Sequence, residues 1–281
     1  MSEVRPAEVV RRAAGYLQRH DVESPLPTAE ILLARVVGTD RAGLYTRTAG
    51  LSSAEARRFG RALCRRCSGT PTQHITGEQG FRRLLLEVRP GVFVPRPETE
   101  VLVAEALRLL DGVDRPCVVD VGTGTGAVAL SIKDERPDAT VFATDRSRAA
   151  VELAEANATR LGLDVVVIEG DLLEPLPSEV AGSLHLVVSN PPYVSPDEYA
   201  ALPHEVRADP VEAVVGEIEV YERLFAQALR WLGPGGAVAV EIDDGRADAV
   251  CHAAEVVGFL SIRVARDLAG RDRVVTARSP A

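Results

Sequence analysis

Length, composition and charge set the first limits on what this chain can do. At 281 residues it exceeds one typical domain, so we expect one large domain or two unequal ones, and a hydrophobic fraction of 46% is enough for a core. The net charge of −9 argues against a protein that holds nucleic acid mainly through its phosphates.

The first 72 residues have the pattern of a small helical domain. Apolar residues recur at helical spacing from Pro6 to about Arg19, and a second helix fits Pro27 to Val37. Residues 52–55, SSAE, form a capping-box pattern that opens a third helix running to about Cys67. The domain carries no motif for chemistry, so we expect it to serve recognition or support.

Charge is distributed unevenly along the chain. Residues 1–115 carry 18 arginines and 14 acidic residues, a balance of +4, which leaves −13 for the remainder. The N-terminal part is therefore the better candidate to face an acidic partner such as RNA. A solvated helical surface is the simpler interpretation of the same arginines.

The segment from Gln73 to Pro95 is predicted to link two domains. Glycines punctuate short strand-like pieces as far as Val88, which indicates a β-hairpin. Residues 92–100, VFVPRPETE, are held extended by their prolines until a helix begins near Pro97 and runs through Leu110. This stretch is either an interdomain linker with a well-started helix or a rigid rim of charged groups beside a site.

Residues 117–126, CVVDVGTGTG, read as a buried strand followed by a glycine-rich turn into a helix that starts near Ala127. Glycines let the backbone approach a ligand closely and direct its N–H groups at the ligand. Asp120 beside the turn disfavours a pyrophosphate and suits a ligand with an ammonium or sulfonium group. The candidate ligand-binding residues of this loop are Gly122, Thr123, Gly124, Thr125 and Gly126.

Acidic residues follow the next two predicted strands. The strand from Thr140 to Thr144 leads to Asp145, whose carboxylate is placed to accept hydrogen bonds from both hydroxyls of a ribose. A helix is predicted for 147–161, and a strand for 164–168 leads to Gly170, Asp171 and Leu172. Asp171 could reach an adenine amino group, and a loop-capping role for it is equally compatible with the pattern.

The most unusual stretch is residues 187–193, VVSNPPY. A strand from Leu184 to Val188 brings Asn190 to its C-terminal end, and Pro191 and Pro192 remove two backbone donors and stiffen the turn. A rigid polar turn at the carboxyl edge of a parallel sheet lies where open α/β sheets bind ligands. An asparagine cap in an ordinary loop is the plainer interpretation of these residues taken alone.

The remainder of the chain completes an alternating pattern. A loop containing His204 is predicted to reach Pro210, and His204 is interpreted as a solvated loop residue. The further predicted elements are a helix over 220–231, a sharp turn at 233–236, a strand over 237–242, a helix over 246–257 and strands over 260–264 and 273–277. The order predicts an α/β fold with a seven-stranded, doubly wound, Rossmann-like sheet that closes with an antiparallel pair.

Cysteine usage and the apolar runs bear on the compartment. Cys64 and Cys67 form a lone C-x-x-C with no second pair and no nearby histidine at ligand spacing, so we expect no metal site. Free thiols fit a reducing cytoplasm. No run approaches the roughly 18 apolar residues of a membrane span, and the N-terminus lacks the apolar segment of a signal peptide. These features predict a cytoplasmic protein.

In its motifs the chain resembles S-adenosylmethionine-dependent methyltransferases of the Rossmann-like class, and more narrowly the HemK/PrmC family of protein-glutamine N5-methyltransferases. The resemblance covers nearly the whole chain and rests on residues 73–77, 94–100, 120–126, 170–171 and 190–193. The N-P-P-Y motif alone is shared with DNA-adenine and RNA-guanine amino methyltransferases, whereas P-R-P-E-T-E after a helical domain is more selective. The resemblance implies a helical substrate-recognition domain (1–72), a hairpin linker (73–95) and a methyltransferase domain (96–281).

The resemblance also implies a reaction. The substrate would be the glutamine of the Gly-Gly-Gln loop in class I release factors, with S-adenosylmethionine as methyl donor and S-adenosylhomocysteine as product. The implied cofactor-binding residues are Gly122, Thr123, Gly124, Thr125, Gly126, Asp145, Asp171, Leu172 and Asn190. The implied substrate-binding residues are Asn190, Pro191, Pro192 and Tyr193, of which Asn190, Pro191 and Tyr193 are the candidate catalytic residues. A monomer that binds no nucleic acid stably is expected.

Departures from the family pattern leave alternatives open. Thr28-Ala29-Glu30 stands where the family usually has D-A-E, and Leu172 stands where an aromatic residue is common. Residues 216–220 replace the family's stretch of Gly-Gly and Asp-Gly-Leu, and Glu241-Ile242-Asp243 replaces its Glu-Ile-Gly. The change at 216–220 bears on the protein target, so an N-methyltransferase for another amide or amino group is the main alternative. A nicotinamide-dependent oxidoreductase is disfavoured by the Asp-x-Gly turn and N-P-P-Y. A non-catalytic cofactor-binding module is disfavoured by the intact motifs.

Overall fold

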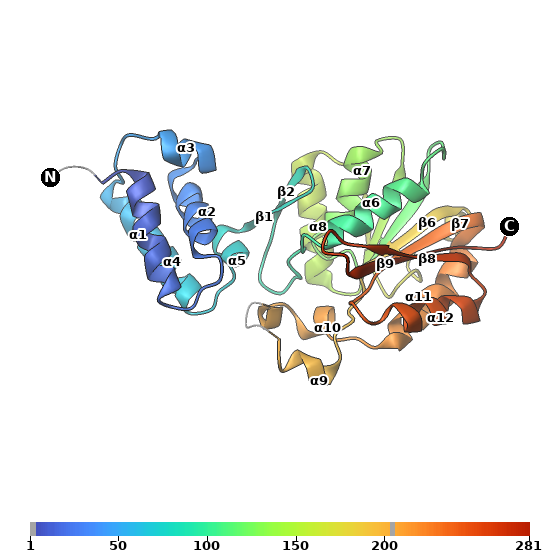
Figure 1. The fold of residues 1–281 in the computed structure, drawn as a ribbon. Helices are drawn as coiled ribbons and strands as arrows, with labels where there is room; N and C mark the ends of the chain where they lie inside the picture. The colour runs from blue at the N-terminus through green and yellow to red at the C-terminus, as the bar shows by residue number, and fades with distance from the viewer. Residues whose placement is uncertain (1–3, 203–205) are drawn as a thin grey trace. The chain divides into compact units, whose positions relative to one another are not determined.

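The computed structural model of the protein describes residues 4–202 and 206–281 (Figure 1). The chain forms two units: residues up to Glu78 together with Val206–Ala208, and Gln79–Leu202 together with Asp209–Ala281. Each unit has hydrophobic clusters of its own. His204 lies outside the described residues.

The first unit is helical in its described part. Its helices are α1 (Pro6–Gln18), α2 (Pro25–Val37), α3 (Arg41–Thr46), α4 (Ser53–Cys67), α5 (Thr72–Thr76) and the 3-10 turn η2 (Val206–Ala208). The capping box predicted for α4 is confirmed, because Ser52 Oγ accepts from Glu55 N at 3.2 Å and Glu55 Oε2 accepts from Ser52 N at 2.7 Å. Helix α3 was not predicted, and α5 occupies the start of the segment predicted as a hairpin.

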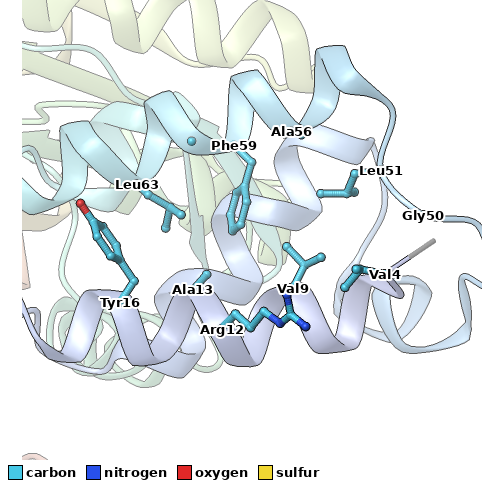
Figure 2. A pocket seen from close by; sticks show the side chains of 11 residues that line it. Val4, Val9, Arg12, Ala13, Tyr16, Gly50, Leu51, Ala56, Phe59 and Leu63 are labelled. Atoms are coloured by element: carbon cyan, nitrogen blue, oxygen red, sulfur yellow. The ribbon is translucent and has the colours of Figure 1, made fainter. Parts of the chain in front are cut away.

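A groove of about 610 Å³ lies between α1 and α4 in this unit (Figure 2). Val9, Ala13, Phe59 and Leu63 line it with apolar surface, and Tyr16 stands at one end. None of the residues that the sequence predicts for chemistry lies in its lining.

The hairpin of β1 (Glu78–Phe81) and β2 (Leu84–Glu87) is confirmed, although it starts later than predicted. Arg82 forms its turn with a φ of 49°, donates its backbone N–H to Glu100 Oε1 at 2.9 Å, and pairs with Glu135. Phe81 is buried in the core. The hairpin is thus fixed to the helices of the second unit.

The second unit contains the predicted seven-stranded sheet. Its strands are β3 (Cys117–Val121), β4 (Thr140–Asp145), β5 (Val166–Glu169), β6 (Leu184–Ser189), β7 (Leu232–Glu241), β8 (Leu260–Arg266) and β9 (Asp272–Arg278). They lie in the order β5-β4-β3-β6-β7-β9-β8; β9 pairs antiparallel with both β7 and β8, and the other neighbouring strands pair in parallel.

Two layers of helices cover this sheet (Figure 1). The helices are α6 (Thr99–Leu109), α7 (Ala127–Glu135) and α8 (Arg148–Leu161) on one side, and α11 (Ile218–Trp231) and α12 (Ala247–Val257) on the other. Successive strand residues alternate between the layers: Val118 packs in the cluster with α6 and α7, and Val119 in the cluster with α11 and α12. Because both faces are covered, the central strands are apolar on both sides.

Two local predictions for the C-terminal half were wrong. The glycine run 233–236 belongs to β7 instead of forming a separate sharp turn, because Ser279 N donates to Gly236 O at 2.8 Å and Ser279 Oγ to Gly233 O at 2.9 Å. A segment distant in sequence therefore extends the strand. The stretch predicted as a loop contains α9 (Pro196–Tyr199) and leads to α10 (Val211–Val214), and a 3-10 turn, η1 (Ser178–Val180), precedes β6.

Candidate active site

Strand register brings four segments to one edge of the sheet. Val121 pairs with both Thr144 and Ser189, and Ser189 pairs with Val240. The next residue of each strand is Gly122, Asp145, Asn190 and Glu241, respectively. The carboxyl edge of a parallel sheet is where open α/β folds bind ligands. Two of the predicted motifs and Asp145 therefore meet at this edge.

The glycine-rich loop has a backbone that requires glycine. Gly122, Gly124 and Gly126 have φ angles of 72°, 57° and 83°, in the left-handed region that side chains disfavour. The N–H groups of Gly122 and Thr123 donate to Thr144 O at 2.8 and 3.0 Å, which anchors the loop on β4. A Cβ at Gly122 or Gly124 would meet no atom within 4 Å, so open space lies beside these glycines. This cradle fits a cofactor laid against the loop.

Asp120 braces the loop from below. Its Oδ2 accepts from Thr123 Oγ1 at 2.6 Å and from Ala129 N at 3.1 Å, and its side chain is 1% exposed. Burial raises the pKa of this carboxyl to about 7, against the effect of both hydrogen bonds. These contacts give Asp120 a role within the loop, and its predicted role of facing a charged ligand stays a prediction.

Asp145 connects the glycine-rich loop to the start of α8. Its Oδ2 accepts from Gly124 N at 2.9 Å and its Oδ1 from Ser147 N at 2.9 Å. Burial raises the pKa of this half-buried carboxyl, and the two backbone donors oppose the rise. Each oxygen retains a second lone pair, so the predicted contact with ribose hydroxyls stays compatible with the geometry and stays a prediction.

Asp171 and Leu172 occupy the turn after β5. Asp171 pairs with Arg223 of α11, so its carboxylate already has a cationic partner. Leu172 has a φ of 49°, its carbonyl accepts from Thr144 Oγ1 at 2.8 Å, and its side chain packs against the second cluster. The predicted contact of Asp171 with adenine stays a prediction.

The N-P-P-Y turn is held at both ends. Ser189 Oγ donates to Val121 O at 2.8 Å, and Asn190 Nδ2 donates to Thr99 Oγ1 at 3.2 Å. Tyr193 packs against the second hydrophobic cluster, and burial raises the pKa of its hydroxyl further above the physiological range. The amide of Asn190 is thus anchored through its nitrogen.

Gly216, the first residue of the stretch that departs from the family pattern, contacts this turn, and the sequence did not predict that contact. A Cβ on Gly216 would lie 2.2 Å from Pro192 O, so only glycine fits there. Gly216 N donates to Val194 O at 3.0 Å, and Val194 N donates to Val214 O at 3.0 Å. The segment at 216–220 that departs from the family pattern therefore keeps its glycine where the turn needs it.

Asp209 is a second residue that the sequence did not reveal. It is 4% exposed, accepts from Val94 N at 3.1 Å and pairs with Arg96. Burial raises the pKa of Asp209, and Arg96 opposes the rise. Arg96 also lies 5.1 Å from the centre of the Phe93 ring. Asp209 thereby braces the start of the P-R-P-E-T-E segment, and the role of this segment as a rim beside the site stays a prediction.

The described residues include no cluster of three or more His, Cys, Asp or Glu side chains able to hold a metal ion, and the four cysteines are free. Among residues 4–202 and 206–281, no helix is long and apolar enough to cross a bilayer.

Known proteins share both parts of this chain. Residues 89–245 match the family model "Methyltransferase small domain", and residues 8–77 match "PrmC N-terminal domain". A release factor glutamine methyltransferase of Moorella thermoacetica is 40% identical over 96% of this chain and 95% of its own length. The release factor glutamine methyltransferase of Deinococcus radiodurans is 40% identical over 96% of this chain and 97% of its own length. That of Corynebacterium glutamicum is 39% identical over 96% of this chain and 98% of its own length.

Solved structures share the fold at lower sequence identity. The catalytic domain of hMettl16 in complex with an RNA hairpin has a TM-score of 0.56 at 15% identity, covering 82% of this chain and 83% of that one. A ribosomal protein L11 methylase of Lactobacillus delbrueckii subsp. bulgaricus has a TM-score of 0.50 at 23% identity, covering 69% and 84%. The identity of the full-length relatives is far higher and spans both units. The chain therefore belongs to the family of release factor glutamine methyltransferases.

Proposed function

We propose that this chain transfers a methyl group from S-adenosylmethionine to the side-chain N5 of the glutamine in the Gly-Gly-Gln motif of class I release factors. The observation that carries the proposal is the match of about 40% identity over nearly the full length of relatives with that activity in their names. A site at the carboxyl edge of the sheet, with an amide-bearing turn beside a glycine cradle, supports it.

The reaction requires the site to align a weak nucleophile with the methyl group. A carboxamide nitrogen is a poor nucleophile because its lone pair is delocalised into the carbonyl. S-adenosylmethionine supplies an electrophilic methyl group. The Asn190 side-chain oxygen and the Pro191 carbonyl would accept hydrogen bonds from the substrate NH2 group, which aligns the nitrogen and favours the positive charge that develops on it. Tyr193 would pack against the amide plane. The proton can leave after transfer, so no strong base is needed.

Cofactor binding is assigned to the glycine cradle and the two acidic turns. Gly122, Gly124 and Gly126 would let the cofactor lie against the backbone, and Asp145 would accept from the ribose hydroxyls. The remaining cofactor-binding residues proposed are Thr123, Thr125, Asp171, Leu172 and Asn190. For Asp171 to reach adenine, its pair with Arg223 would have to rearrange.

Partner recognition is assigned to the helical N-terminal unit, which carries the excess of arginine. The reaction would take place in the cytoplasm, where translation terminates, and the enzyme would act as a monomer without stable nucleic-acid binding. A different amide or amino substrate is the alternative. The identity of about 40% to full-length release factor glutamine methyltransferases favours the glutamine amide.

The test is mass spectrometry of a purified class I release factor after incubation with the protein and S-adenosylmethionine. We expect one added methyl group, mapped to the Gly-Gly-Gln glutamine, and none on a release factor in which that glutamine is alanine. Absence of methylation of a folded release factor, with cofactor binding shown by calorimetry, would contradict the proposed substrate.

A further inference from the structure

A buried polar chain runs inward from the N-P-P-Y turn. Asn190 Nδ2 donates to Thr99 Oγ1 at 3.2 Å, and the Thr99 hydroxyl lies close enough to the Glu241 carboxyl to lower its pKa. Thr99 is 3% exposed and Glu241 is 1% exposed. These residues stand just after β6, at the first position of α6 and at the last position of β7. Only the tertiary structure brings them together.

The chemistry of the groups fixes the direction of each hydrogen bond. An ionised carboxylate only accepts, so beside an ionised Glu241 the Thr99 hydroxyl is favoured to direct its single hydrogen at that carboxylate. The Thr99 oxygen then offers only lone pairs, and Asn190 has to meet it with the NH2 end of its amide. The oxygen of the Asn190 amide is thereby directed to the other side.

We propose that Glu241 and Thr99 are positioning residues that determine which end of the Asn190 amide meets the substrate. A half-turn flip of an asparagine amide changes its shape very little but exchanges acceptor for donor. A flipped Asn190 would present hydrogens to the NH2 group of the substrate and would repel it. The proposal rests on the proposed function for its substrate, a carboxamide, but the state of the Asn190 amide can be measured without the substrate.

The Glu241 carboxyl is buried. Its Oε2 has no hydrogen-bond partner in the part of the chain that the structure describes. The titratable groups that face it are Arg273, Glu98, Tyr193 and Tyr221. Burial raises the pKa of Glu241 to about 7, opposed by Thr99 and Arg273. Protonation would give Glu241 a hydrogen to donate to Thr99, which would release the constraint on Asn190.

The kinetic test compares two substitutions of one residue. Thr99→Val keeps the shape but removes the hydroxyl, and we expect kcat on the release factor to fall by about tenfold or more, with little change in the Kd of S-adenosylmethionine. Thr99→Ser restores the hydroxyl and should return kcat to within about threefold of the wild type. A wild-type kcat in Thr99→Val would overturn the proposal.

Tyr221→Phe is the matched control. The Tyr221 hydroxyl donates to the main-chain carbonyl of Glu241 at 2.8 Å. This variant therefore removes a buried hydrogen bond to the Glu241 main chain and leaves the Glu241 carboxyl unchanged. Tyr221→Phe should lower thermal stability and leave kcat within about twofold of the wild-type value. Equal losses of kcat in Tyr221→Phe and Thr99→Val would show a general packing effect and would also overturn the proposal.

A spectroscopic measurement tests the influence of Glu241 on the Asn190 amide through Thr99, called the relay below, without turnover. The side-chain amide signals of Asn190 in a ¹⁵N-labelled protein, identified by their loss in Asn190→Ala, should titrate near pH 7, where Glu241 changes charge. In Glu241→Gln this titration should vanish. Asn190 signals that do not titrate, or that titrate equally in Glu241→Gln, refute the relay. If the wild type fails to methylate a release factor but the titration is present, the proposed substrate fails and the relay stands.

Discussion

Burial of Asp120 without a cation makes the stability of the second unit depend on pH. Its ordinary pKa is 3.8 and its pKa in the folded protein is about 7. Because the folded state holds the proton more tightly, its contribution to stability is complete below pH 4 and is lost as the pH rises through 7. At about 1.4 kcal/mol per pKa unit, ionisation costs on the order of 4 kcal/mol.

We expect Asp120→Asn to remove most of this pH dependence. The asparagine oxygen can still accept from Thr123 and Ala129, and it carries no charge to bury. Urea unfolding followed by fluorescence of Trp231, the single tryptophan, reports on this unit. The variant should be more stable than the wild type at pH 8 and similar to it at pH 4. Equal stabilities at both values would contradict the assignment.

The proposed role of Asn190 can be separated from cofactor binding. In Asn190→Ala we expect kcat to fall by about 10²–10³-fold, because the acceptor that orients the substrate nitrogen and stabilises its developing charge is lost. The Kd of S-adenosylmethionine, measured by titration calorimetry, should change by only a few-fold. Wild-type turnover with normal cofactor binding would show that this role is wrong.

At the scale of an element, the glycine-rich loop separates two reasons for being glycine. Gly126 has a left-handed φ, and a Cβ there would lie 2.9 Å from Leu130 Cδ1 and 3.3 Å from Ala154 Cβ. Gly124 has a left-handed φ, but a Cβ there would enter open space. Gly126 therefore serves both the turn and the packing of α7 and α8, whereas Gly124 serves the turn and leaves room for a ligand.

Alanine substitutions at these two positions should have different effects. Gly126→Ala is expected to cost about 2–4 kcal/mol of unfolding free energy, from φ strain and overpacking, and Gly124→Ala about 1 kcal/mol, from φ strain alone. Gly124→Ala should instead weaken S-adenosylmethionine binding, since its methyl group occupies the cradle. Urea denaturation and titration calorimetry of both variants would reveal this contrast, and equal profiles would exclude it.

At the scale of the whole molecule, each unit has its own core. One cluster, including Leu17, Leu33, Leu44 and Phe59, lies within the helical unit, and two larger clusters lie on the faces of the sheet. Because each unit has a separate hydrophobic core, the two units are expected to unfold in separate transitions. The cofactor site proposed here lies entirely within the second unit.

We therefore expect two transitions in scanning calorimetry. S-adenosylmethionine at about 100 times its Kd should stabilise only the second unit, by about 2.7 kcal/mol. Trp231 fluorescence should report the transition whose midpoint temperature rises with cofactor. Leu44→Ala should lower the midpoint temperature of only the other transition, that of the helical unit. A single transition that shifts as a whole with cofactor would show that the two units unfold together.

The sequence alone determined the architecture and the motifs of this protein. Apolar periodicity, the capping box at Ser52 and the glycines after β3 are local signals, so the longer helices, the seven strands and the turns that hold Gly122–Gly126, Asp145 and Asn190 could be predicted from neighbours in the chain. Local patterns failed where distant segments decide. Residues 233–236 are strand because the C-terminal segment pairs with them.

Only the tertiary structure decided which polar groups meet. Strand register brought the ends of β3, β4, β6 and β7 to one edge. Asp209 was joined to Arg96 across more than a hundred residues. Thr99, at the start of α6, was brought to Asn190 and to Glu241. Hydrogen bonds and pKa values depend on burial and on distances of a few ångströms. Sequence spacing does not encode these quantities, so the supports of the site appeared only with the fold.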